Sequence, residues 1–195
     1  MNDDIKKIQQ QLVVAADGIF GRRSYAALAQ ATKNGKQIKI TENWFFSELI
    51  KSDTAARHGI DNMPSLEHTQ HLIEACVNLW QPIRDLLGVP VSNSCAYRSP
   101  RLNALIKGAS KTSVHMIGYA MDMTAPRFGS PTKIAQFLSQ ELPKRGVKFD
   151  QLILEYPDHA NGGWLHVGYK SNAGLQRGRL TLKLTGQAYR EVGRF

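Results

Sequence analysis

The sequence has little cysteine and no long apolar run. Its 195 residues include two cysteines, Cys76 and Cys95, which form no Cys-x-x-Cys pair. This excludes a disulfide framework, and we expect two reduced, buried thiols. No apolar run approaches the ~20 residues of a transmembrane helix, so we expect no membrane-spanning segment. The start, MNDDIKKIQQQ, lacks the apolar centre of a signal peptide, which predicts synthesis in the cytoplasm and another route to any extracytoplasmic target.

Acidic residues are scarce beside basic ones. The chain has 16 Asp and Glu against 25 Lys and Arg, a net charge of +9. Such a surface favours polyanionic partners, which include nucleic acid, anionic lipid and acidic cell-wall polymers. The basic residues are scattered and no DNA- or RNA-binding module is recognised, so we expect no nucleic-acid partner. The length and the 42% hydrophobic content fit one main globular domain, which we expect to be monomeric.

The first 36 residues predict a small helical unit, followed by a main domain over residues 37–195. Within the first 36 residues, apolar positions recur at helical spacing: Ile5, Ile8 and Leu12. The turn that separates the two helices is Asp17-Gly18. The Asp-Gly-x-Phe-Gly sequence at residues 17–21 resembles one half of a peptidoglycan-binding three-helix module. Such modules usually carry two halves, so a purely structural hairpin is the alternative.

Beyond residue 41 the chain shows helical and strand patterns without internal repeats. Apolar spacing and end signals predict helices over residues 65–87, 99–108 and 130–143. Short apolar or alternating runs predict strands over residues 89–94, 119–124, 151–156, 164–170 and 180–185. Helices come first and strands dominate later, with short connections. We therefore expect an α+β fold with a mainly antiparallel sheet and flanking helices.

Two histidines and one aspartate are candidate metal ligands. His115 and Asp122 lie seven residues apart across Gly118, and His166 follows far downstream. An unpaired carboxylate in the apolar strand around Asp122 would be costly, and a cation would offset that cost. Two imidazoles and one carboxylate suit Zn²⁺ with a position left for water, so we expect a zinc site in a cleft on the sheet. The spacing alone is not specific, and satisfied surface histidines with a hydrogen-bonded aspartate are the alternative.

A zinc hydrolase also needs a group that accepts the proton of the attacking water. Glu155 is the first candidate, because it lies in an apolar strand where a carboxyl group is suited to proton transfer. A structural glutamate on an edge strand is the alternative. His159 follows in a loop and is the second candidate, either for proton transfer or for stabilising the oxyanion.

Arg98 stands between a predicted strand and the start of a helix, where ligand-binding side chains are common. Its guanidinium could hold a substrate carboxylate or carbonyl oxygen. A structural salt bridge is the alternative. The remaining histidines fall in or near helices and are expected to be surface or core residues: His58, His68 and His71.

The candidates belong to a longer ordered pattern. In chain order it comprises Tyr97-Arg98-Ser99-Pro100, Asn103, Gly108, Ser113-x-His115-x-x-Gly118-x-Ala120-x-Asp122 and Trp164-x-His166. Together these segments resemble the zinc D-alanyl-D-alanine carboxypeptidase family and its phage endolysin relatives, over residues 41–170. Two departures stand out. Glu155 precedes His166 by eleven residues, where relatives often place the acid closer, and Cys95-Ala96 replaces a commoner Ser-Gly.

The resemblance implies a role for each candidate. Zn²⁺ would bind His115, Asp122 and His166, and a glutamate before the last histidine would act as acid and base. Substrate contacts would come from Arg98, Ser113 and Trp164. Glu155 is then the expected acid–base residue, with Arg98 and His159 beside it in the catalytic set.

The expected function is a zinc metallopeptidase that hydrolyses amide bonds in peptidoglycan stem peptides. A basic lytic enzyme without a signal peptide suits a phage or prophage endolysin, which acts on the cell wall after release or as part of a virion. One alternative is a D-alanyl-D-alanine carboxypeptidase, in which Arg98 reads the free carboxylate of the substrate. Another is a non-catalytic zinc-containing protein that binds the wall or builds the virion.

Overall fold

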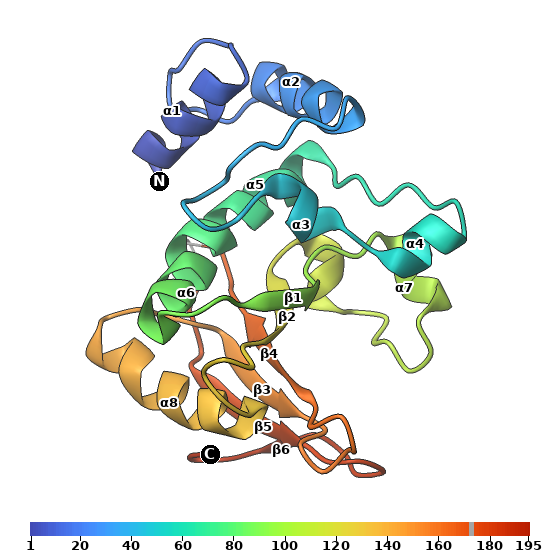
Figure 1. The fold of residues 1–195 in the computed structure, drawn as a ribbon, viewed down its shortest axis with the longest axis vertical. Coiled ribbons are helices and arrows are strands. Elements are labelled where there is room, and N and C mark those ends of the chain that lie inside the picture. Colours follow the sequence, from blue (N-terminus) through green and yellow to red (C-terminus); the bar gives the residue numbers. More distant parts are fainter. Residues whose placement is uncertain (172–173) are drawn as a thin grey trace. The chain divides into compact units, whose positions relative to one another are not determined.

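The computed structural model describes residues 1–171 and 174–195 and shows an α+β fold (Figure 1). The chain divides into two compact units. The first unit comprises Met1–Val77 and Cys95–Tyr119, and the second comprises Asn78–Ser94 and Ala120–Phe195. The α+β class with flanking helices is therefore confirmed. The sequence boundary near residue 36 stays a prediction.

The first unit is helical. Its elements are α1 (Asn2–Gln11), α2 (Arg22–Lys33), α3 (Phe46–Ile50), α4 (Asp53–Arg57), α5 (Leu66–Ala75), α7 (Pro100–Leu105) and the 3₁₀ turn η2 (Val114–Ile117). Ser99 begins α7 as the pattern predicts, since its hydroxyl accepts a hydrogen bond from the Leu102 N–H. The helix ends at Leu105, before the predicted stop at Gly108.

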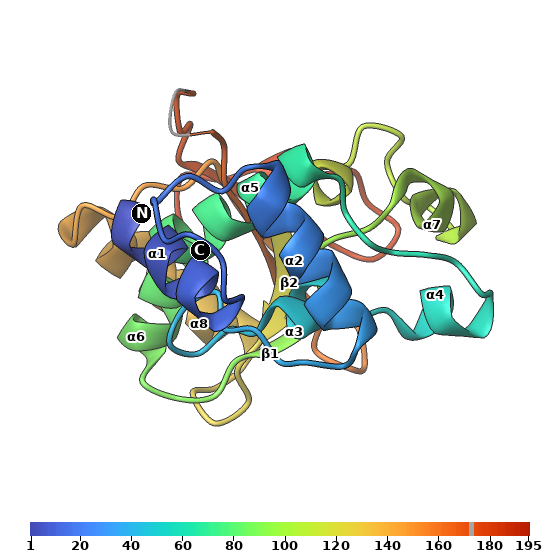
Figure 2. The same cartoon turned by 90° about the horizontal axis from the view of Figure 1, so that it is seen from above.

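The predicted N-terminal hairpin is present, and α1 and α2 can be followed from above in Figure 2. A buried glutamine organises the turn between them. The Gln9 amide donates to Asp17 Oδ1 at 2.7 Å and to Ser24 Oγ at 3.1 Å, and its Oε1 accepts from the Gly18 N–H at 2.9 Å. The Asp-Gly-x-Phe-Gly sequence thus has an internal structural role. Binding of cell wall by this hairpin stays a prediction.

The helix predicted over residues 65–87 begins and ends as expected. The Ser65 hydroxyl caps its start, and Gly88 ends it with a left-handed φ of 61°. Between α5 and α6 (Gln81–Leu87), the chain forms a π-helical turn, η1 (Cys76–Trp80). Apolar spacing does not reveal such a turn, because the same face stays buried on both sides of it. The boundary between the two units falls inside η1.

The second unit contains the six-stranded sheet. Its order is β1 (Ser92–Cys95), β2 (Ala120–Thr124), β4 (Trp164–Gly168), β3 (Gln151–Glu155), β5 (Arg179–Lys183) and β6 (Arg190–Glu191). The pairs β2–β4, β3–β4 and β5–β6 are antiparallel, and β3–β5 is parallel. The mainly antiparallel sheet is therefore confirmed. The edge-strand interpretation of Glu155 is wrong, because β3 lies between β4 and β5.

The two faces of this sheet differ in chemistry. One face is apolar and buried, and α8 (Pro131–Lys144) packs on β3 and β4. Its residues include Met121, Met123, Leu152, Leu154, Leu165 and Val167. Paired residues of neighbouring strands point to the same side. Since Asp122 pairs with His166, and Glu155 with Trp164, these four side chains share the opposite face.

Candidate metal centre

Asp122 and His166 form a side-chain pair at the centre of the second unit. They are direct partners in the antiparallel ladder between β2 and β4. His166 Nδ1 lies 2.9 Å from Asp122 Oδ1, and both side chains are largely buried. The apolar neighbours of His166 in β4, Leu165 and Val167, face the other way. The fold thus brings together two of the three expected ligands, which lie 44 residues apart in the sequence.

The donor atoms of this pair are of types that bind zinc in proteins. Tetrahedral Zn²⁺ with bonds of ~2.0–2.1 Å separates adjacent ligand atoms by roughly 3.3 Å. The 2.9 Å between His166 Nδ1 and Asp122 Oδ1 is shorter, because the two side chains are joined by a direct hydrogen bond. A carboxylate and an imidazole are also borderline-hard donors, the class that zinc prefers.

His115 belongs to the first unit and lies in the η2 turn, with 3% of its surface exposed. Its Nδ1 is 2.8 Å from the carbonyl oxygen of Ala96. A carbonyl only accepts, so Nδ1 carries the proton and donates, and the lone pair is on Nε2. Metal-binding histidines are typically held this way, with the second ring nitrogen hydrogen-bonded to a carbonyl. The environment of His115 therefore suits a ligand that acts through Nε2.

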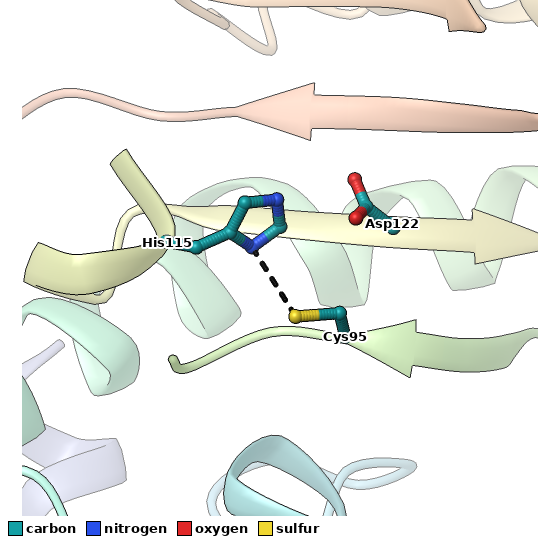
Figure 3. A group of neighbouring side chains, drawn as sticks. All are labelled: Cys95, His115 and Asp122. Carbon is teal, nitrogen blue, oxygen red and sulfur yellow. Dashed lines mark hydrogen bonds between the residues drawn. The ribbon is translucent and has the colours of Figure 1, made fainter. Parts of the chain in front are cut away.

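Cysteine is a common metal ligand, but the sequence predicted only a reduced, buried thiol at Cys95. It is half-buried rather than buried, and both cysteines are free. Figure 3 shows its Sγ beside His115, with the contact to Nδ1 measuring 3.8 Å. The thiol therefore lies beside the protonated nitrogen, and Nε2 is on the far side of the ring. Cys76, by contrast, is fully buried, and burial raises the pKa of its thiol to about 12.

The loop after His115 is held by side chains of α5. His71 Nδ1 bonds the carbonyl of Ile117 at 2.8 Å, and the His71 ring stacks on Tyr119 with centroids 4.2 Å apart. The Tyr119 hydroxyl donates to Glu74 Oε2 at 2.5 Å. His71, expected to be an ordinary surface or core residue, therefore anchors the turn that carries His115.

Gly118 is the point where this loop meets α5. Its φ of 82° is in the left-handed region, and a Cβ there would lie 2.6 Å from the carbonyl oxygen of His68. Only glycine satisfies both conditions. The sequence predicted that Gly118 turns the backbone between His115 and Asp122. Its close approach to α5 is an additional reason for glycine.

Glu155 ends β3 on the same sheet face as Asp122 and His166, in the register position opposite Trp164. The next residue, Tyr156, has a left-handed φ of 53°, which is strained for a tyrosine. A Cβ on Gly163 would lie 1.9 Å from the Glu155 carbonyl oxygen, so the return strand approaches β3 closely there. Tyr189, which belongs to none of the sequence motifs, donates its phenol proton to Glu155 Oε1 at 3.0 Å.

His159 lies in the loop between β3 and β4 and is exposed. Its Nδ1 accepts the N–H of Asn161 at 3.4 Å, a local loop contact. The structure therefore places Glu155, rather than His159, on a strand of the sheet, on the face that carries Asp122 and His166. The role of each in proton transfer stays a prediction.

The three residues expected to contact substrate, Arg98, Ser113 and Trp164, each carry a hydrogen-bonding side chain. The half-buried Arg98 and Trp164 each have a buried nitrogen, Nε and Nε1 respectively, without a hydrogen-bond partner among the described residues. Buried donors are usually paired, so such atoms are suited to a ligand. Ser113 precedes η2, and its hydroxyl makes no capping bond to that turn. Arg98 and Ser113 belong to the first unit and Trp164 to the second.

Comparison with known proteins gives one family match. Residues 42–159 match the family model described as Peptidase M15. The matched range includes Arg98, His115, Asp122 and Glu155 and ends before His166. A search of curated proteins finds no match to the chain. Across the described residues, no helix combines the length and apolar character needed to cross a membrane.

Proposed function

The chain belongs to the peptidase M15 family, and from this premise we propose a zinc-dependent peptidase that hydrolyses amide bonds in peptidoglycan stem peptides. The family match supports the resemblance that the motifs indicated. The observation that carries the proposal is the Asp122–His166 pair, which shares a sheet face with Glu155. A carboxylate–imidazole pair and a nearby second carboxylate are the groups that metal-assisted hydrolysis requires.

In this proposal His115, Asp122 and His166 hold the zinc ion. Six residues separate His115 from Asp122, and Gly118 turns the chain between them. The hydrogen bond from His115 Nδ1 to Ala96 leaves Nε2 as the ligand atom. Cys95, at Nδ1, is then a neighbour of the ring and not a ligand.

A bound zinc ion supplies Lewis acidity, which activates water and polarises the amide carbonyl. Glu155 accepts a proton from the attacking water and delivers it to the departing amine. Its place on a regular strand keeps the carboxylate oriented during both transfers. His159 is the second candidate for this role.

Substrate orientation falls to Arg98, Ser113 and Trp164. The unpartnered Arg98 Nε and Trp164 Nε1 can donate to carbonyl oxygens of the stem peptide. The Ser113 hydroxyl can add a further hydrogen bond. Since Arg98 is a charged donor, its contact contributes most where the peptide carries a carboxylate.

That property of Arg98 supports a second candidate function within the same chemistry. A D-alanyl-D-alanine carboxypeptidase needs a cation that reads the free carboxylate at the end of the stem, and Arg98 offers one. Product analysis separates the two activities. A carboxypeptidase releases free alanine and leaves cross-links intact, whereas an endopeptidase opens the cross-linked network.

The biological setting we propose is lysis of the cell wall by a phage or prophage endolysin. The net charge of +9 supports approach to an anionic envelope. In this setting the protein would reach the wall after the membrane is breached, or as part of a virion. The helical hairpin of residues 1–36 is a candidate wall contact.

The decisive experiment is mass spectrometry of purified peptidoglycan incubated with the protein, with and without a chelator. We expect new amide-cleaved muropeptides that disappear with the chelator and return with Zn²⁺. Glu155→Gln should lower the cleavage rate by about 10²–10⁴-fold, the usual contribution of general acid–base catalysis. Glu141→Gln, on the outer helix α8, is the matched control and should behave as the wild type.

Two outcomes would contradict the mechanism. Cleavage that survives both the chelator and Glu155→Gln excludes it. Zinc binding without any cleavage would instead favour a non-catalytic zinc-containing protein that binds the wall or builds the virion.

A further inference from the structure

The C-terminal segment brings a tyrosine to the carboxylate of Glu155. The Tyr189 hydroxyl donates to Glu155 Oε1 at 3.0 Å, across 34 residues of sequence. Tyr189 lies beyond the range matched by the family model, which ends at residue 159. Tyr189 therefore falls outside every motif on which the proposed function rests.

Sheet register explains why the two side chains meet. Glu155 pairs with Lys183 in the parallel ladder of β3 and β5. On β6, Arg190 pairs with Leu182, so the preceding residue, Tyr189, comes opposite Lys183. Paired positions share a face. Glu155, Lys183 and Tyr189 therefore form one row on the face that also carries Asp122 and His166.

Lys183 holds the tyrosine ring in this row. Its Nζ lies 5.2 Å from the centre of the Tyr189 ring and 5.8 Å from that of Tyr156. The same ammonium donates to the carbonyl of Gln187 in the turn before Tyr189. Cation–π contacts and a backbone bond thus fix the ring, although 56% of the Tyr189 surface is exposed.

A second carboxylate ties the turn to the loop after Glu155. Asp158 Oδ2 accepts the N–H of Thr185 at 3.0 Å, and its Oδ1 accepts the Thr185 hydroxyl at 3.3 Å. Asp158 follows Glu155 by three residues, and Thr185 precedes Tyr189 by four. A second contact therefore links the two segments beside the Tyr189–Glu155 hydrogen bond.

The electrostatics of Tyr189 agree with a permanent donor. Burial, and next the negative charge of Glu155, raise the pKa of the Tyr189 phenol above its ordinary value of 10.0. The phenol thus stays protonated at neutral pH. The charged and titratable groups around this contact are Lys183 on β5, Tyr156 at the end of β3, and Asp122 on β2.

We propose that Tyr189 is a positioning residue for Glu155, so that the C-terminal segment is part of the active site. The inference rests on the proposed function, because it assumes that Glu155 transfers the proton. By donating to Oε1, Tyr189 holds the carboxylate on the zinc face of the sheet. It also favours the charged form of Glu155, which is the form that accepts a proton from water.

The test is Tyr189→Phe, which keeps the ring over Lys183 and removes only the hydroxyl. We expect kcat for muropeptide cleavage to fall by about tenfold with KM within about twofold, a fraction of the full acid–base contribution. The acidic limb of kcat/KM should move to higher pH, since Glu155 loses a donor that stabilises its charge. Thermal unfolding should be unchanged, which a structural role would not predict.

The matched control is Tyr156→Phe. It removes the phenol of the other tyrosine beside Lys183, whereas the hydrogen bond to Glu155 Oε1 comes from Tyr189. This variant should keep the wild-type kcat and pH profile. If Tyr189→Phe also keeps both, while Glu155→Gln is inactive, the inference about Tyr189 is wrong and the proposed function stands. A wild-type protein that leaves peptidoglycan intact overturns both.

Discussion

Asp122 and His166 face each other across β2 and β4, with Oδ1 and Nδ1 2.9 Å apart. The register of β2 and β4 makes the two residues direct partners, so their side chains meet without a bound cation. A site built on regular strands loses little conformational freedom when it binds a ligand. Two paired strands therefore hold this part of the proposed zinc site in place.

Replacing Asp122 with Asn should remove the zinc. The amide keeps the size of the side chain but loses the charge that attracts a divalent cation. We expect zinc affinity to fall by more than the roughly 100-fold that loss of an outer partner costs. Metal content after gel filtration measures this directly. Asp53→Asn, at the exposed start of α4, is the control, and an unchanged zinc content in Asp122→Asn would remove Asp122 from the ligand set.

Replacing Cys95 with Ser should leave the zinc in place. The thiol lies 3.8 Å from His115 Nδ1, the ring nitrogen that donates to Ala96. A ligand would instead share the Nε2 side of the ring. We expect zinc affinity to change by less than about tenfold, the lower end of an outer-partner effect. His115→Gln, measured alongside, should lose the metal, and equal losses in both variants would make Cys95 a ligand.

Replacing Gly118 with Ala should destabilise the protein more than the same change at Gly108. Both glycines have a similar left-handed φ, 82° and 78°. A Cβ at Gly118 would lie 2.6 Å from the His68 carbonyl oxygen, whereas nothing lies within 4 Å at Gly108. The backbone term is ~1–2 kcal/mol at either site, and overpacking adds about 1–3 kcal/mol at Gly118 alone. The difference in urea stability between the two variants measures the overpacking term. Equal losses of stability would mean that α5 shifts to make room for the added Cβ.

Stability should fall on mild acidification, in part through His68. Burial, and next the nearby His71, lower the pKa of His68 below its ordinary 6.5. The unfolded chain therefore binds a proton more readily than the folded one. Stability is full above pH 6.5 and declines as the pH falls toward the lowered pKa. Urea unfolding at pH 7.5 and 5.5 should show a smaller decline in His68→Gln, whereas His58→Gln should match the wild type.

Local patterns predicted much of the fold. Short apolar or alternating runs predicted β2, β3 and β4. Capping residues located the starts of α5 and α7. These signals are short-range, because each depends on residues within one turn or a few strand positions. The η1 turn and β6 were not predicted, because neither interrupts the local pattern of apolar residues.

Residue types and their order in the chain were enough to identify the family and the candidate ligands His115, Asp122 and His166. Contacts between segments that lie far apart in the sequence were determined only by the tertiary structure. The parallel pairing of β3 with β5 moved Glu155 from an expected edge to the interior of the sheet. The same pairing, extended by β6, brought Tyr189 to its carboxylate. Strand register sets these contacts, and it depends on the packing of whole faces, which no single stretch of sequence encodes.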